Sequence, residues 1–322
     1  MPERGNVILE ADDVATWFPV KGPLGTIVNH VKAVDGVSLR LYEGETYGLV
    51  GESGCGKSTF GRTLIRLLEP TRGQIRIFGK DVTHLRAKEL LPLRKDVQIV
   101  FQDPYTSLNP RQRVGDMLME AQAIHSMGDK AERMERAMMM LAQVGLRPEH
   151  FYRYPHEFSG GQRQRIGLAR ALILEPKIIV CDEPVSALDV SIQSQIINLL
   201  KDLQQQRGLT YLFIAHNMSM VKYISDRVGV MYLGHLVEEA PTDELFAHPT
   251  HPYTQTLMSA VPSIDPRDKR ERIVLKGELP SPISPPEGCV FHTRCPFAVE
   301  ACAKAVPMRR LVGPEHRVEC PR

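Results

Sequence analysis

The chain has 322 residues, of which 43% are hydrophobic and 24% are charged. These values are ordinary for a globular protein and exclude a disordered, collagen-like or coiled-coil chain. Lys and Arg number 40 against 38 Asp and Glu, and the formal charge of +2 is too weak to indicate a nucleic-acid binder by itself. The sequence contains no apolar run of membrane-spanning length and no visible secretory signal, so we expect a cytoplasmic protein.

Four short apolar segments are typical of buried parallel strands: residues 46–50, 97–101, 177–181 and 210–215. Helix-length stretches separate them, which predicts an α/β fold. Ligands in such sheets bind beyond the carboxyl ends of the strands. A glycine-rich loop, Gln102, Asp182, Glu183 and His216 follow these strands, so we expect all of them to face one crevice.

The first strand leads into a glycine-rich loop that fits the phosphate-loop pattern Gly-x4-Gly-Lys-Ser. Its glycines let backbone N–H groups turn toward phosphates, and the helical pattern of residues 59–68 places a helix N-terminus behind them. Lys57 is expected to reach the β and γ phosphates and Ser58 to ligate Mg²⁺. Cys55 is expected to be a small filler, because no His or Asp partner that could activate it is evident. The predicted binding residues are Gly51, Ser53, Gly54, Cys55, Gly56, Lys57, Ser58 and Thr59.

A second strand, residues 178–181, delivers two adjacent carboxylates to the end of the sheet. Asp182 is expected to hold Mg²⁺, and Glu183 to orient and deprotonate an attacking water. Between the loop and this strand, Ser159 is a natural N-cap for a helix from Gln162 to Leu174. The Ser-Gly-Gly turn offers unobstructed N–H groups, so it is either a second anion-binding element or only a helix start.

These motifs resemble, in content and order, the nucleotide-binding subunit of an ABC transporter. The matching residues extend from about 7 to 240. Phe158 stands where the signature commonly begins with Leu, which is a mild departure. The motifs are the Walker A loop 51–58, the Q-loop Gln102, the signature 158–162, the Walker B strand ending at Asp182 and Glu183, the D-loop Ser186-Ala187-Leu188-Asp189, and the switch His216.

The resemblance implies a P-loop NTPase fold of ABC type, with a RecA-like parallel-sheet core, an antiparallel β subdomain and a helical subdomain at about residues 103–176. It also implies a dimer in which each ATP lies between the Walker A loop of one subunit and the signature of the other. His216 would touch the γ-phosphate, and Gln102 would reach Mg²⁺ and report the nucleotide state to a membrane partner. The signature and D-loop would supply Ser159, Gly160, Gly161, Gln162 and Asp189.

The family usually stacks adenine on an aromatic residue upstream of the Walker A loop. Trp17 and Phe18 are the two candidates, and a core or surface aromatic with no such role is the alternative. We assign the role to Phe18 as a hypothesis.

Residues 241–322 form a C-terminal region beyond the ATPase core of residues 1–240. In this region the stretch His-Pro-Thr-His-Pro-Tyr-Thr at 248–254 resembles the tail motif of oligopeptide and dipeptide importer ATPases, a group that includes nickel and glutathione importers. Residues 31–38, 51–56, 103–110 and 277–282 are similar to the "F" subunit of dipeptide importers. The residues alone indicate only a turn with an aromatic anchor, so the substrate class depends on the resemblance.

Four cysteines of the C-terminal region are separated by five, six and seventeen residues: Cys289, Cys295, Cys302 and Cys320. Four thiols suit a metal, but the spacing does not choose between zinc, an iron–sulfur cluster and unliganded or disulfide-bonded thiols. In the peptide importer subunits that the chain resembles, this pattern is associated with a [4Fe-4S] cluster. The cluster would be structural, because the proline-rich region has little apolar content. His292 is a weaker ligand candidate.

We therefore expect an enzyme that hydrolyses ATP with Mg²⁺ and drives import of short peptides. It would lie on the cytoplasmic face of the inner membrane. Its expected partners are a sister ATPase or a second copy of itself, two transmembrane permease subunits and, indirectly, an extracytoplasmic binding protein, but no nucleic acid. The alternatives are the same role in a nickel or glutathione importer and a non-transport ABC ATPase of DNA repair or translation. The last is disfavoured, because neither a long coiled-coil insertion nor a second ATPase core is present.

Overall fold

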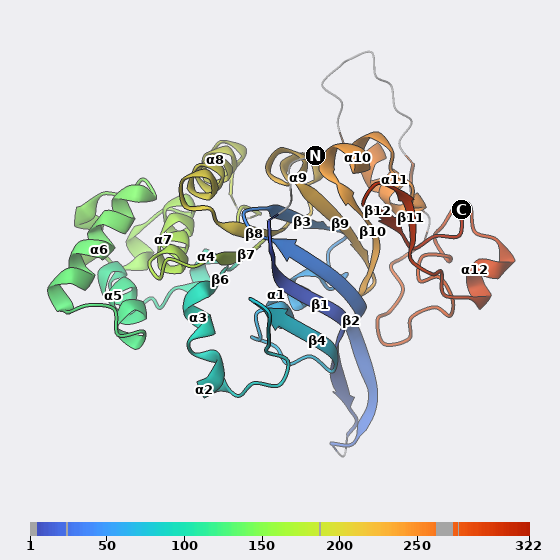
Figure 1. The fold of residues 1–322 in the computed structure, drawn as a ribbon, viewed down its shortest axis with the longest axis horizontal. Helices are drawn as coiled ribbons and strands as arrows, with labels where there is room; N and C mark the ends of the chain where they lie inside the picture. The colour runs from blue at the N-terminus through green and yellow to red at the C-terminus, as the bar shows by residue number, and fades with distance from the viewer. Residues whose placement is uncertain (1–4, 24, 187, 262–272, 276) are drawn as a thin grey trace, which may run out of the picture. The chain divides into compact units, whose positions relative to one another are not determined.

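The computed structural model describes residues 5–23, 25–186, 188–261, 273–275 and 277–322, which form two compact units (Figure 1). The β-rich unit contains residues 6–84 and 213–322, and the helical unit contains Gly5 and residues 85–212. Strand β8 (Thr210–Ile214) contributes residues to both units. The C-terminal region thus belongs to the same unit as the predicted phosphate loop, and the expected domain limit at residue 240 stays a prediction.

The β-rich unit contains an antiparallel sheet of order β2-β1-β4-β5. Long strands β1 (Val7–Lys21) and β2 (Ile27–Tyr42) pair along most of their length, and β4 (Arg72–Ile77) and β5 (Lys80–Asp81) follow. Alternate residues such as Leu9, Ala11, Leu39, Leu41 and Ile75 are buried, as the period of two predicts. This sheet confirms the expected antiparallel β subdomain.

A second set of strands in the β-rich unit has the order β11-β12-β10-β9-β3. Strand β3 (Thr46–Val50) is buried throughout and runs parallel to β9 (Arg227–Tyr232), which pairs antiparallel with β10 (His235–Pro241). The C-terminal strands β12 (His316–Val318) and β11 (Arg310–Gly313) extend this sheet through β10. The helices of this unit are α1 (Lys57–Leu64), α9 (Met218–Ile224), α10 (Thr242–Ala247), α11 (Pro252–Ser259) and α12 (Glu300–Lys304).

The helix after the phosphate loop is shorter than the pattern predicted. Helix α1 ends at Leu64 and not at Leu68. Arg66 has a φ of 57°, and its Nε donates a hydrogen bond to the carbonyl oxygen of Val82. A left-handed residue cannot continue an α-helix, so the chain turns here toward β4.

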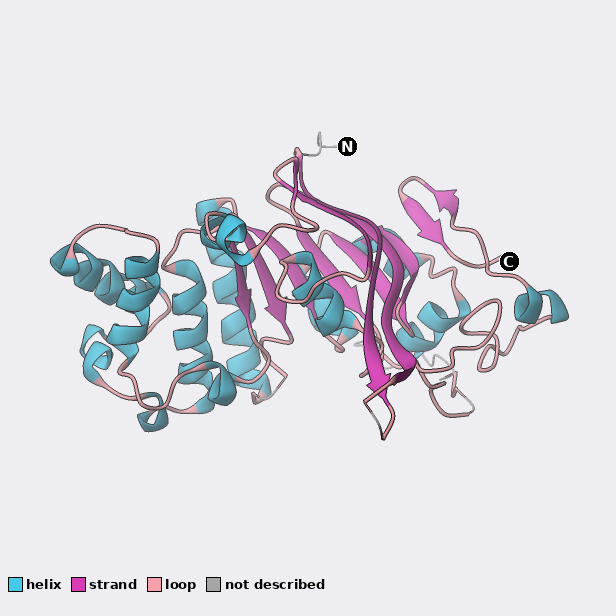
Figure 2. Cartoon of the chain, turned by 90° about the horizontal axis from the view of Figure 1, so that it is seen from below, coloured by secondary structure: helices cyan, strands magenta, loops and turns pink. Residues whose placement is uncertain are grey.

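The helical unit contains the parallel strands β6 (Val97–Val100) and β7 (Ile178–Asp182). In Figure 2 its helices lie side by side, and their core includes Leu118, Ala137, Leu141 and Ile166. The helices of this unit, with the two 3₁₀ helices labelled η, are α2 (Ala87–Leu90), α3 (Leu93–Asp96), α4 (Pro104–Ser107), α5 (Val114–Ile124), α6 (Lys130–Gln143), η1 (Pro148–Tyr152), η2 (Pro155–Glu157), α7 (Gly160–Leu172) and α8 (Val190–Arg207).

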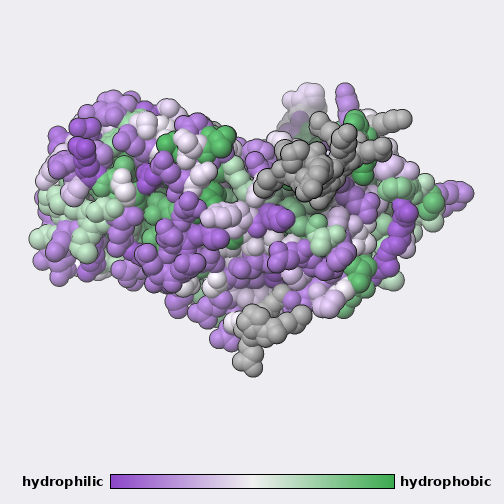
Figure 3. Space-filling model, turned by 90° about the horizontal axis from the view of Figure 1, so that it is seen from above, coloured by the Kyte–Doolittle hydropathy of each residue, from purple (hydrophilic) through white to green (hydrophobic). Residues whose placement is uncertain are grey.

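Within the described residues, no helix combines the length and the apolarity needed to cross a bilayer. On the face drawn in Figure 3, hydrophobic residues form scattered patches among hydrophilic ones. Scattered exposed apolar residues are normal for a folded surface.

Candidate functional site

The predicted phosphate loop leaves the end of β3 and enters α1, as the sequence indicated. Two glycines are required by close contacts with other backbone segments. A Cβ on Gly51 would lie 2.1 Å from the carbonyl oxygen of Met231, and a Cβ on Gly56 would lie 2.0 Å from that of Ala33. Both residues also have positive φ angles, 154° and 103°, which disfavour other residue types. The loop can therefore adopt this path only with glycine at these positions.

Lys57 lies inside the curve of this loop. Its side chain is almost completely buried, and Nζ donates hydrogen bonds to the carbonyl oxygens of Gly51 at 2.8 Å and Glu52 at 2.9 Å. These carbonyls hold the ammonium group at the centre of the loop. A cation there can bind a phosphate oxygen that reaches the loop.

The other residues of the loop differ in exposure. Ser53 and Gly54 are exposed at its tip, and Ser58 and Thr59 are partly exposed on the first turn of α1. Cys55 is buried, and burial raises the pKa of its thiol. The thiol is therefore protonated near neutral pH, which agrees with a filler role and argues against a nucleophile.

Glu52 of the phosphate loop has two partners that sequence reasoning missed. Its carboxylate forms a two-pronged ion pair with Arg294, with Nη1 to Oε2 at 2.8 Å and Nη2 to Oε1 at 3.2 Å. Its backbone N–H donates to the hydroxyl oxygen of Tyr253 at 2.8 Å. The sequence indicates Tyr253 only as an aromatic anchor, and no spacing in the sequence relates Arg294 to residue 52.

In the helical unit, the structure brings the Q-loop glutamine to the carboxylate that ends the predicted Walker B strand. Gln102 Nε2 donates to Oε2 of Glu183 at 2.9 Å. Glu183 has a φ of 46°, a strained conformation for a non-glycine residue, while the preceding Asp182 is fully buried at the end of β7. Strain of this kind commonly occurs at functional positions. The sequence predicted both side chains but not their contact.

The Ser-Gly-Gly turn begins helix α7 with a capping box. Ser159 Oγ accepts the N–H of Gln162, and Gln162 Oε1 accepts the N–H of Ser159 at 3.1 Å. The predicted N-cap is therefore confirmed, although the helix runs from Gly160 to Leu172 and not from Gln162 to Leu174. A Cβ on Gly161 would lie 2.6 Å from Cγ2 of Ile192, so this glycine also allows α7 to pack closely on α8.

Asp189 of the predicted D-loop caps helix α8. Its Oδ1 accepts hydrogen bonds from Ile192 N–H at 3.0 Å and from Ser191 Oγ at 2.7 Å. These bonds, the one from Ser191 above all, lower the pKa of the Asp189 carboxyl. Ala187 of the same motif lies outside the described residues. Asp189 thus has a clear local role, and its part in nucleotide binding stays a prediction.

The switch histidine and the two aromatic candidates belong to the β-rich unit. His216 is exposed directly after β8, next to Asn217, whose side chain caps α9. Trp17 is flanked by cations, with Lys32 Nζ at 5.0 Å and Arg72 Cζ at 5.9 Å from its ring centre. Phe18 is 39% exposed, so its ring retains free surface for stacking.

The four cysteines of the C-terminal region line one cavity of about 350 Å³. Burial raises the pKa values of Cys289 and Cys295, and the neighbouring thiols raise them further. All six cysteines of the chain are free of disulfides. However, no group of three or more His, Cys, Asp or Glu side chains in the described part of the chain is arranged to hold a metal ion. The expected metal-holding module is therefore not shown.

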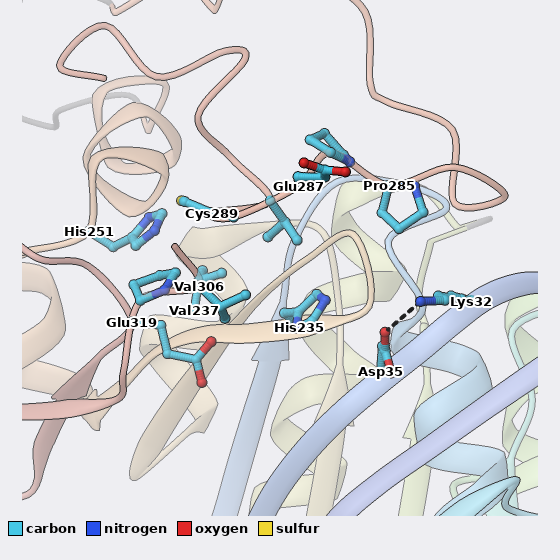
Figure 4. Close-up of a pocket in the computed structure, with 14 residues that line it drawn as sticks. Lys32, Asp35, His235, Val237, His251, Pro285, Glu287, Cys289, Val306 and Glu319 are labelled. Atoms are coloured by element: carbon cyan, nitrogen blue, oxygen red, sulfur yellow. Dashed lines mark ion pairs between the residues drawn. The ribbon is translucent and has the colours of Figure 1, made fainter. Parts of the chain in front are cut away.

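An adjacent cavity of about 290 Å³ is lined both by residues of the C-terminal region, such as Cys289 and Glu319, and by earlier residues such as Asp35 and His235 (Figure 4). Burial lowers the pKa of His251 to about 4 and raises that of Glu319 to about 7. His251 Nδ1 accepts the N–H of Tyr253 at 3.1 Å and so begins helix α11. His251 therefore acts as a neutral structural residue next to the aromatic anchor.

Two families match the chain in separate segments. Residues 34–186 match the family described as "ABC transporter", and residues 237–302 match "Oligopeptide/dipeptide transporter, C-terminal region". Over 317 residues the chain is 56% identical to the oligopeptide transport ATP-binding protein AppF of Bacillus subtilis, covering 97% of this chain and 96% of the relative. The chain belongs to the oligopeptide-type family of ABC transporter ATP-binding proteins.

Other relatives of this family agree with the match. The oligopeptide transport ATP-binding protein OppF of Salmonella typhimurium is 53% identical over 329 residues, covering 99% of this chain and 97% of the relative. Among solved structures, the dimeric ATP-binding cassette MJ0796 bound to ADP and Pi is similar with a TM-score of 0.66 and 28% identity. That comparison covers 73% of this chain and 99% of the cassette. The chain is thus an ABC-type ATPase with the ABC fold.

Proposed function

We propose that this ATPase powers the uptake of di- and oligopeptides through a separate membrane permease. The match of residues 237–302 to the oligopeptide and dipeptide C-terminal family is the observation that carries the substrate class. The relatives AppF and OppF, which are oligopeptide transport ATP-binding proteins more than half identical to this chain over nearly its whole length, support it. Nothing in the chain favours the nickel, glutathione, DNA-repair or translation alternatives.

In this proposal the phosphate loop binds the phosphates of ATP. Backbone N–H groups of the loop other than that of Glu52, together with the N-terminus of α1, would face the phosphates, and Lys57 would contact the β and γ phosphates. The buried position of the Lys57 ammonium supports this role, because a cation with few waters interacts strongly with an anion. The exposed ring of Phe18 would stack on adenine.

Glu183 would accept the proton of the attacking water. Its hydrogen bond from Gln102 supports this role, because a donor on one carboxylate oxygen fixes the direction of the other. Asp182, Ser58 and Gln102 would provide the oxygen ligands that Mg²⁺ prefers, and the ion would neutralise the charge on the phosphates. His216 would hold the γ-phosphate in place.

A complete site would need a second ATPase subunit. Ser159, Gly160, Gly161, Gln162 and Asp189 would contact the nucleotide bound to that subunit, which is a sister ATPase or a second copy. Two permease subunits would span the membrane, with this chain on the cytoplasmic face and a binding protein delivering peptides from outside. The dimeric solved cassettes support the pairing.

Glu183→Gln tests the catalytic assignment. The variant should bind Mg–ATP as the wild type does and lose turnover by about 10²-fold or more, because the general base is removed. ATP binding and hydrolysis are measured on the full chain assembled with its permease. Glu175→Gln, a change at an exposed residue just before β7, is the matched control and should keep full turnover. Wild-type turnover in Glu183→Gln would remove Glu183 from the mechanism.

We also propose that the four C-terminal cysteines bind a [4Fe-4S] cluster. The proposal is supported by the four thiols that line one cavity, since such a cluster takes four cysteine thiolates. The cluster would tie together residues 289–320, whose regular structure is limited to α12 and two short strands. Deprotonation of Cys289 and Cys295 would accompany binding, since both thiols are otherwise held protonated.

Iron, sulfide and zinc per chain, measured after anaerobic purification, test this proposal. About four irons and four sulfides per chain with broad visible absorption are expected. Cys302→Ser should release most of the iron, whereas Cys181→Ser, at a buried thiol of β7 in the helical unit, should retain it. Zinc at one per chain, or no metal, would overturn the cluster.

A further inference from the structure

Glu52, in the phosphate loop, is fixed at three points. Arg294 holds its carboxylate with two hydrogen bonds, and the hydroxyl oxygen of Tyr253 accepts its N–H. Lys57 binds its carbonyl oxygen at 2.9 Å. Two of the three partners come from the C-terminal region, more than 200 residues further along the chain.

Arg294 is a buried cation that needs this carboxylate. Its side chain is 9% exposed, and it lies over the ring of Tyr232 at 5.9 Å. The pKa of Arg294 is raised, chiefly by its hydrogen bond to Glu52. Removing one partner of a buried, two-pronged pair leaves the other without its hydrogen bonds, which is costly. Arg294 therefore holds the Glu52 side chain firmly.

Tyr253 is held just as rigidly. Its ring lies 4.8 Å from that of Tyr232 and 5.4 Å from that of Phe291, and all three rings are almost completely buried. Packed aromatic rings of this kind leave little rotational freedom. The hydroxyl that accepts the N–H of Glu52 is thus a fixed point, which prevents the loop from turning at residue 52.

Arg294 belongs to the turn that bears the first two cysteines of the C-terminal region. The N–H of Arg294 donates to the carbonyl oxygen of Phe291 at 3.0 Å, and the N–H of Cys295 donates to the carbonyl oxygen of His292. The N–H of Cys289 donates to the carbonyl oxygen of Cys302 at 2.7 Å. Residues 289–295, which we call the cysteine turn, place the guanidinium group at the phosphate loop.

We propose that Arg294 and Tyr253 are positioning residues for ATP binding, which act through Glu52 on the phosphate loop. The inference rests on the proposed role of this loop and deepens it, because it makes the cysteine turn a support that holds the phosphate loop in place. A loop held in its binding conformation before ATP arrives loses less conformational freedom on binding. Both residues would act on the loop and not on the nucleotide itself, so their effect falls on affinity and not on the chemical step.

A double-mutant cycle with Glu52→Gln and Arg294→Gln tests the coupling. Each single change in the full chain should raise the Kd for a fluorescent ATP analogue by about 10-fold, the size expected for a charge-assisted hydrogen-bonded pair. Turnover at saturating ATP should stay within about twofold of wild type. The double variant should bind no more weakly than the worse single variant, because both changes remove the same interaction.

The inference would be overturned if the losses of affinity were additive in the double variant, or if the single variants bound the ATP analogue with the wild-type Kd. Arg294→Lys should recover part of the affinity, since an ammonium group can make one of the two bonds. Tyr253→Phe should also raise Kd, because it leaves the Glu52 N–H without its acceptor.

Arg309→Gln is the matched control. Arg309 also joins the C-terminal region to the core, through Glu239 and the carbonyl oxygen of Ser38, but neither partner belongs to the phosphate loop. It should lower thermal stability and leave Kd unchanged. An equal rise in Kd for Arg309→Gln would mean general loosening and overturn the positioning role. A wild-type chain that binds no ATP would instead refute the proposed function itself.

Discussion

The phosphate loop and the C-terminal region, both parts of the β-rich unit, are specified in different ways. The loop follows from local sequence: a buried strand, glycines at positions with positive φ, and a helix start. The C-terminal region depends on contacts between distant residues, such as His316 with Glu238 and Arg309 with Glu239. A motif can thus reveal the first region, whereas only the folded chain reveals the second.

The two regions also use charge differently. In the loop, Lys57 is held by backbone carbonyls, which leaves a cation available for an anionic ligand. At the junction with the C-terminal region, buried carboxylates of β10 are paired with groups from that region. Glu238, for example, accepts the N–H groups of Thr250 and His251 as well as binding His316. Changes in the loop should therefore alter binding, and changes in the C-terminal contacts should alter stability, with the Glu52 contacts as the exception.

The largest effect is expected for Lys57→Ala. Removing the ammonium group should weaken ATP binding by about 10²-fold or more, because several charge-assisted bonds to phosphate are lost. Titration with a fluorescent ATP analogue checks this, with the exposed Lys304→Ala as control. Because Lys57 also holds the carbonyl oxygens of Gly51 and Glu52, the melting temperature without ATP is measured alongside to verify that the variant is folded. Unchanged affinity would refute the phosphate-loop assignment.

A smaller effect, on stability, is expected for His316→Gln. The hydrogen bond to buried Glu238 raises the pKa of His316, so its stabilisation is complete below the unfolded pKa of about 6.5 and is lost as the pH rises through the folded pKa. The variant should lose about 2 kcal/mol at pH 6, or roughly 4–8 °C in melting temperature, and less at pH 9. His248→Gln, at an exposed histidine, is the control. A difference that grows with pH would contradict the assigned pair.

Glu319→Gln should have the smallest effect, in the opposite direction. Because burial raises the Glu319 pKa to about 7, the folded state resists ionisation, and stability falls as the pH rises from about 4.5 to 7. The variant should be more stable above pH 7 by about 1 kcal/mol and unchanged at pH 4. Melting curves at both pH values test this, with exposed Glu278→Gln for comparison. Destabilisation at pH 8 would show that the carboxylate is needed.

Much of the fold could be predicted from the sequence. The strand at 46–50, most of the predicted strand at 210–215 and the Ser159 cap depend on local patterns, and the structure contains them. The antiparallel subdomain, which the family resemblance implied, is present too. The early end of α1 was missed, because it depends on Arg66 reaching Val82 in a neighbouring segment. The pairing of β12 with β10 was missed for the same kind of reason, since three residues carry little pattern of their own.

In the candidate site, too, some residues could be identified from the sequence, whereas the contacts between them are seen only in the structure. Lys57 could be identified from the spacing of the phosphate-loop pattern and Glu183 from its place at the end of a buried strand, whereas the role of Gln102 was implied by the family resemblance. The bond between Gln102 and Glu183 joins residues 81 positions apart, and that between Glu52 and Arg294 joins residues 242 apart. Side-chain pairs of this kind leave no periodic signal in one sequence. The role of Arg294 therefore came from the structure alone.

Hydrogen exchange of the loop amides tests most directly whether the cysteine turn positions the phosphate loop. Exchange of the peptide covering residues 50–60 would be measured by mass spectrometry in wild type, Arg294→Gln and Arg309→Gln, without nucleotide. The account predicts faster exchange in this peptide for Arg294→Gln and wild-type exchange for Arg309→Gln. Exchange in Arg294→Gln that matches wild type would contradict it.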